Sequence, residues 1–129
     1  MVPRKPQLPT NGELSILQVL WERGPCTVRE VQEELDKGRP TGYTTVLKLM
    51  QIMTDKGLVR RDESQRTHVY VARLTQEQTQ RQLLRDLMDR AFEGSAGNLV
   101  MRALTEDLTT EDELTKIRKL LEEREEETP

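Results

Sequence analysis

The sequence has few of the residues that enzymes and metal proteins depend on. Among its 129 residues are one cysteine, Cys26, and one histidine, His68. A single cysteine excludes an intrachain disulfide and a multi-cysteine metal site, and no nucleophile, base and orienting group form a plausible catalytic set. We therefore expect no enzymatic activity, no cofactor and no metal. Cys26, between Pro25 and Thr27 at a helix start, is interpreted as a small packing residue rather than a redox switch.

Aromatic residues and long apolar runs are also scarce. Aromatic residues make up 3% of the chain, too few for a platform on which single-stranded bases stack. No run approaches the roughly 18 apolar residues of a membrane span, and the N-terminus lacks the apolar core of a signal peptide. We expect a cytoplasmic protein without membrane insertion. Double-stranded DNA, read by hydrogen bonds, remains open as a partner.

The net charge of −3 conceals two unlike halves of the chain. From Met1 to Leu74 there are 12 Lys and Arg against 9 Asp and Glu, giving +3, and from Thr75 to Pro129 there are 8 against 14, giving −6. Affinity for phosphate depends on positive charge close to the backbone and not on the charge of the whole chain. The pattern predicts a mildly basic head followed by an acidic tail.

Two helices are predicted near the N-terminus, after a flexible, Pro-rich arm of residues 1–9. The first ends at Arg23, before Gly24-Pro25, and the second begins at a capping box formed by Thr27 and Glu30. The apolar stripe of the first helix is Leu14, Leu17, Val19, Leu20 and Trp21. The core positions of the second helix are Val28, Val31 and Leu35.

A third helix is predicted over Tyr43 to Lys56, with Gly57 as its stop signal. Its inward positions are Val46, Leu49, Met50 and Met53. Two strands follow, Leu58 to Arg61 and His68 to Val71, around a polar turn of residues 62–66. Three helices and a hairpin within residues 10–73 predict a winged helix-turn-helix domain, so the fold class is mainly α with a small β-hairpin (α+β).

The outward face of this third helix suits DNA recognition. Thr44, Lys48 and Gln51 share that face with Asp55, and Thr45 lies beside it. The second helix of a helix-turn-helix enters the major groove, where Gln, Lys and Thr side chains can read base edges. The face could equally be solvated, but the hairpin favours DNA because basic residues lie where a wing meets phosphates. These basic residues are Arg60, Arg61, Arg66 and His68.

The remaining residues, 74–129, predict a helical tail. Thr75 opens a long helix that ends near Gly94, and two shorter helical segments follow. Their apolar stripes need burial that single helices cannot provide, so we expect a second copy of the tail to cover them in a homodimer. The predicted dimerisation residues are Leu83, Leu84, Leu87, Met88, Phe92, Leu99, Val100, Leu104, Leu114, Ile117, Leu120 and Leu121.

Three stretches, GELSILQVLWERGPCTVREVQEEL, GYTTVLKLMQIMTDKGLVRR and RTHVY, resemble the BlaI/MecI family of bacterial penicillinase and methicillin-resistance repressors. The likeness extends over about Leu8 to Leu121. It implies a winged-helix repressor that binds a palindromic operator as a homodimer through its C-terminal helices. It also implies a membrane sensor and protease system that acts on the repressor indirectly. Carried over, the recognition helix would contain Tyr43, Thr44, Thr45 and Lys48, and the wing would contain Arg66 and His68.

Two departures from the family pattern concern how repression is relieved. Penicillinase-type members are cleaved between Asn and Phe in the dimerisation region, where this chain has Arg102-Ala103, with only Asn98-Leu99 nearby as a partial likeness. Copper-responsive relatives carry a C-terminal C-x-C motif, which this tail lacks. A winged helix that binds only other proteins is the alternative function. The basic hairpin and the resemblance both favour DNA.

Overall fold

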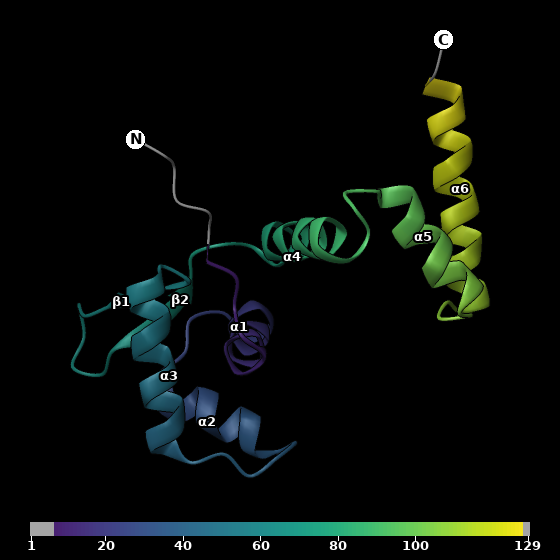
Figure 1. The fold of residues 1–129 in the computed structure, drawn as a ribbon. Helices are drawn as coiled ribbons and strands as arrows, with labels where there is room; N and C mark the ends of the chain where they lie inside the picture. The colour runs from purple at the N-terminus through teal and green to yellow at the C-terminus, as the bar shows by residue number, and fades with distance from the viewer. Residues whose placement is uncertain (1–6, 128–129) are drawn as a thin grey trace, which may run out of the picture. The chain divides into compact units, whose positions relative to one another are not determined.

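The computed structural model describes residues 7–127, so most of the predicted N-terminal arm lies outside the described residues. Within that range the chain forms three helices, a hairpin and three further helices, as predicted (Figure 1). The elements are α1 (Asn11–Arg23), α2 (Val28–Asp36), α3 (Tyr43–Lys56), β1 (Val59–Asp62), β2 (Val69–Ala72), α4 (Gln76–Ala91), α5 (Ala96–Thr105) and α6 (Glu111–Glu127). The chain divides into two compact units between Leu83 and Leu84, inside α4.

Local hydrogen bonds determine where the helices of the first unit begin and end. The predicted capping box of α2 is present, with the Thr27 amide donating to Glu30 at 2.9 Å and the Glu30 amide donating to the Thr27 hydroxyl at 3.2 Å. α1 has a second capping box, from Thr10 and Glu13, which sequence reasoning missed. α3 has the predicted bounds because Gly57, at φ +80°, adopts the left-handed conformation that ends a helix.

The core of the first unit lies between α1, α2, α3 and the hairpin. Most predicted inward residues are buried, but Leu14, Trp21, Leu35 and Leu49 are only half-buried. Ile16, which was not predicted, is fully buried because the inward face of α1 is centred on positions 16, 17 and 20. The apolar core consists of Ile16, Leu17, Val19, Leu20, Cys26, Val28, Val31, Val46, Met50, Met53, Leu58, Val59 and Tyr70.

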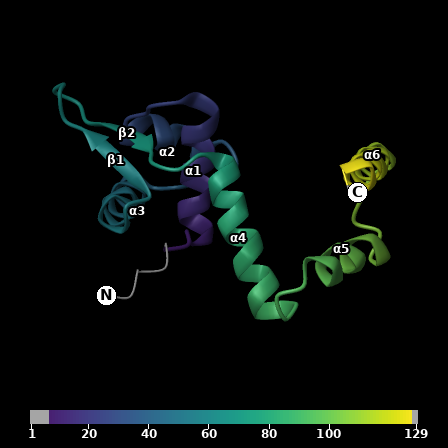
Figure 2. The ribbon, with the colours of Figure 1, turned by 90° about the horizontal axis from the view of Figure 1, so that it is seen from above.

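The hairpin is present, but each strand begins and ends one residue later than predicted. The Leu58 amide donates to the Met53 carbonyl at 2.9 Å and so still closes the end of α3. Strand pairing therefore starts at Val59, which is opposite Ala72. The loop of the hairpin projects beyond the three helices, as a wing does (Figure 2).

Cys26 joins this hairpin to the segment between α1 and α2. It forms an isolated antiparallel bridge with Tyr70, in which the Tyr70 amide donates to the Cys26 carbonyl at 2.8 Å. Burial raises the pKa of the Cys26 thiol. A thiol that stays protonated is a poor nucleophile, which agrees with a packing role.

The second unit, from Leu84 onward, contains the end of α4 together with α5 and α6. α6 has 17 residues against 16 for α4, so the prediction of two shorter segments is wrong for α6. The helix extends because the Glu and Arg residues after Leu121 are good helix formers. No residue of α5 or α6 is buried within the described part of the chain. None of the helices over residues 7–127 combines the length and the apolar character that crossing a membrane requires.

Candidate nucleic-acid interface

α3 presents the predicted polar face to solvent. All five of its predicted DNA-binding residues are exposed: Tyr43, Thr44, Thr45, Lys48 and Gln51. Thr44, Lys48 and Gln51 lie opposite the buried residues Met50 and Met53, whereas Tyr43 lies on a flank of the helix with Leu47. Asp55 shares the outward face near the C-terminal end, where its charge would repel phosphate. The first three turns of α3 therefore form the part that suits a groove.

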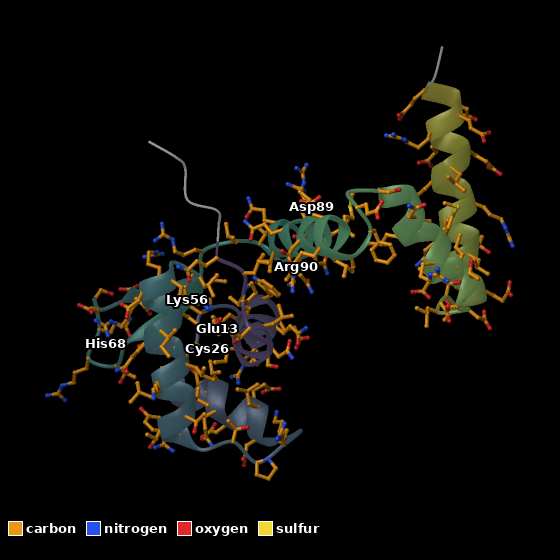
Figure 3. All side chains as sticks on the ribbon, in the orientation of Figure 1. Glu13, Cys26, Lys56, His68, Asp89 and Arg90 are labelled. Carbon is orange, nitrogen blue, oxygen red and sulfur yellow. The ribbon has the colours of Figure 1, made fainter. Side chains whose placement is uncertain are left out.

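A buried ion pair joins the C-terminal end of α3 to α1 (Figure 3). Lys56 Nζ donates to Glu13 Oε1 at 2.7 Å, and the Thr10 amide donates to the same oxygen at 2.8 Å. The Glu13 side chain is 2% exposed and that of Lys56 is 20% exposed. Burial raises the pKa of Glu13, but the hydrogen bonds from Lys56 and Thr10 outweigh it and leave the pKa below the ordinary value of 4.5. The carboxylate is thus charged at neutral pH and holds α3 against α1.

The basic residues of the hairpin do not all face the same way. Arg61 is paired with Tyr70 and Arg60 with Val71 across the strands, so the two arginines point to opposite faces. The Arg61 guanidinium forms an ion pair with Glu63, and hydrogen bonds to Tyr70 and Glu63 raise its pKa. Part of the hydrogen-bonding capacity of Arg61 is therefore already used within the hairpin.

A surface hollow of about 430 Å³ brings the hairpin next to the two helices of the helix-turn-helix. Three predicted residues line it together, namely Tyr43 from α3 and Arg66 and His68 from the hairpin. Arg29, which sequence reasoning missed, lines it as well, and its guanidinium carbon lies 5.3 Å from the centre of the Tyr43 ring. Its place in the first turn of the first helix of the pair is a signal that could have identified it, because that helix crosses the DNA backbone.

The predicted dimerisation residues lie on helices without a core of their own. Within residues 7–127, none of the twelve is buried. Leu84, Leu87, Val100, Leu104, Leu120 and Leu121 are exposed, and Leu83, Met88, Phe92, Leu99, Leu114 and Ile117 are half-buried. Met101 and Leu108, at 58% and 73% exposed, add to this apolar surface.

Three helices, a projecting hairpin and a polar outward face on the third helix together define a winged helix-turn-helix protein. A family model described as penicillinase repressor matches residues 9–123. The chain belongs to this family. It is a DNA-binding transcriptional repressor and not an enzyme.

Individual relatives span different parts of the chain. The penicillinase repressor of Bacillus licheniformis is 22% identical over 118 residues, which cover 92% of this chain and 91% of that protein. The transcriptional regulator BlaI of Mycobacterium tuberculosis is 39% identical over 59 residues, covering 45% of this chain and 43% of that protein. A solution structure of the DNA-binding domain of the repressor BlaI aligns with a TM-score of 0.49 and 23% identity, covering 58% of this chain and 90% of that one.

Removing one hairpin cation should change the salt dependence of DNA binding. Arg66 is exposed at the hollow, so Arg66→Ala is expected to remove one phosphate contact. Because each phosphate neutralised adds about 0.9 to the slope of log affinity against log salt, the slope should fall by roughly that amount for each head that binds, on any DNA sequence. Fluorescence anisotropy at several salt concentrations measures it. An unchanged slope would show that the hairpin stays clear of the backbone.

Proposed function

We propose that this repressor reads a palindromic operator as a homodimer, with α3 in the major groove and the hairpin on the phosphate backbone. The observation that carries the proposal is the exposed set Thr44, Lys48 and Gln51 on one face of α3, beside the basic hollow. A major groove is about 12 Å wide and admits one helix. Lys pairs with guanine acceptors, Gln with the adenine edge, and Thr with a hydroxyl or methyl group.

Lys48 tests the position of α3. Lys48→Ala is expected to weaken binding to the operator by about 1–2 kcal/mol for each half-site and to relax the base preference at one position of each half-site, because one base contact is lost in each. Selection of bound sequences from a random pool identifies the operator, and competition anisotropy then compares the variant with the natural protein.

The matched control is Lys37→Ala, which removes an exposed lysine that pairs with Glu34 at the end of α2. It should keep the base preference. If Lys48→Ala keeps both affinity and preference, α3 is not the recognition helix. If the natural protein selects no sequence and binds no duplex, the interpretation as a protein-binding winged helix is favoured.

The homodimer is supported by the exposed apolar residues of the tail. α5 and α6 bury no residue within the described chain, and a surface of this kind on a soluble domain is typical of an interface. We propose residues 10–73 as the DNA-binding domain and 74–129 as the dimerisation domain, whose first residues, up to Leu83, pack as part of the first compact unit. Since residues 1–74 carry only +3, two linked half-sites would bind much more tightly than one.

The resemblance also implies a membrane sensor and protease as indirect partners. By the resemblance, Arg102-Ala103 occupies the neighbourhood of the family's Asn-Phe cleavage bond, and this part of the chain lies inside α5. Exposed extended segments are the preferred sites of proteolysis, so cleavage at this bond would require α5 to unwind locally.

A further inference from the structure

Arg29 is a positively charged residue at the hollow between α2, α3 and the hairpin, and the proposed function gives it no role. Arg29 is exposed, lies over the Tyr43 ring and lines the hollow with Arg66 and His68. We propose that Arg29 binds a backbone phosphate of the DNA from the α2 side of the hollow, while Arg66 approaches the same stretch of backbone from the hairpin side. This inference rests on the proposed function, since it extends the same interface.

The lining of the hollow favours an anion. Within the described residues, no acidic side chain lines it, and no carboxylate forms an ion pair with Arg29. The neighbouring Glu30 is engaged elsewhere, because its carboxylate caps α2 through the Thr27 amide and pairs with Arg23. A planar guanidinium donates two parallel hydrogen bonds to phosphate oxygens, so Arg29 and Arg66 can both hold the backbone.

Tyr43, which was predicted to contact DNA, acts in this proposal through Arg29 instead, as a positioning residue. It lies on the flank of α3 toward the hollow and not on the outward face of Thr44 and Lys48, and its ring is 5.3 Å from the guanidinium of Arg29. A cation held over an aromatic ring gains about 0.5–1 kcal/mol at an exposed site. The ring therefore restricts Arg29 before DNA arrives, which lowers the entropy lost on binding.

The experiment measures salt slopes for the full-length protein on a labelled duplex of mixed sequence, about 30 base pairs long, because phosphate contacts act on any sequence. Arg29→Ala should lower the slope by about 0.9 for each head on the duplex, which is about 1.8 for a dimer with both heads bound, and Arg29→Ala with Arg66→Ala should lower it by about twice as much. Arg29→Lys should keep the slope, since the charge remains. Arg73→Ala, an exposed arginine outside the hollow, is the matched control and should bind as the natural protein does.

Tyr43 variants test the positioning role separately. Tyr43→Phe keeps the ring and should keep the affinity, whereas Tyr43→Ala should weaken binding several-fold. In the Arg29→Ala background, Tyr43→Ala should have no further effect, because the ring then has no cation to hold. Thermal melts check that each variant folds, which is expected because both side chains are exposed.

The outcomes separate this inference from the proposed function. A slope for Arg29→Ala that falls no more than that of Arg73→Ala would overturn the inference while leaving DNA binding intact. Fully additive effects of the Arg29 and Tyr43 variants would overturn the positioning role. A natural protein that binds no duplex even at low salt would overturn the proposed function itself.

Discussion

A chain that ends at Leu83 is expected to be a monomer that binds the operator at least about 100-fold more weakly than the full-length protein. The gain from linking two binding sites is about 10²–10⁴-fold, and it disappears when each head binds alone. The cut at Leu83 keeps the first compact unit and the hydrogen bond from Trp21 Nε1 to the Leu74 carbonyl, at 3.0 Å. A cut after Arg73 would remove that acceptor, so that a loss of affinity could come from a damaged fold as well as from the lost dimer. Sedimentation equilibrium measures the oligomeric state, and fluorescence anisotropy measures the affinity for the operator.

The truncation also changes the net charge, in the direction that favours DNA binding. Residues 1–83 contain 13 Lys and Arg against 10 Asp and Glu, so the shortened chain carries +3 instead of −3. Electrostatics alone would therefore strengthen its binding to DNA. A loss of affinity despite the gain in positive charge can be attributed to the lost dimer, whereas an unchanged or higher affinity would contradict dimeric reading.

A full-length variant gives the same information without deletion. Leu84→Glu with Leu87→Glu places charges on two exposed residues of α4, 47% and 48% accessible, so the fold of one chain should tolerate them. Charges at a dimer interface are left unpaired and strongly oppose association. A dimer that survives both changes would exclude α4 from the interface and leave only α5 and α6.

Features of the fold that depend on residues close together in the sequence were predicted, whereas features that depend on distant residues were not. α3 was predicted from Tyr43 to Lys56 because its apolar period and its stop at Gly57 are local signals. The hairpin strands were each placed one residue early because the Leu58 amide closes α3 through Met53 instead of pairing with β2. Burial of Glu13 was not predicted, because its partner Lys56 is 43 positions away along the chain.

The candidate site shows the same distinction. Exposed polar residues of α3 were found from helical spacing alone, whereas Arg29 was not, because its contact with Tyr43 depends on how α2 packs against α3. Arg60 and Arg61 were grouped as one basic wing, but the strand register places them on opposite faces. Spacing in sequence identifies a face of one element, and only packing shows which faces meet.

The second large effect is expected at the buried ion pair of Glu13. Glu13→Gln keeps the size of the side chain and removes the charge that accepts from Lys56 and Thr10. Hydrogen bonds to charged groups contribute about 1.5–3 kcal/mol, so the free energy of unfolding at neutral pH should fall by about 2–3 kcal/mol. Urea denaturation measures it, and Glu22→Gln, an exposed change on the same helix, should have little effect.

The pH dependence distinguishes the charge of Glu13 from its packing. Because its folded-state pKa lies below the ordinary value of 4.5, the unfolded chain takes up a proton first as the pH falls. The stabilisation is complete above the ordinary pKa and is lost as the pH falls through the lowered folded-state pKa. The stability difference between the natural protein and Glu13→Gln should thus be largest at neutral pH and shrink in acid. A difference that stays constant with pH would mean that packing, and not the ion pair with Lys56, holds α3 against α1.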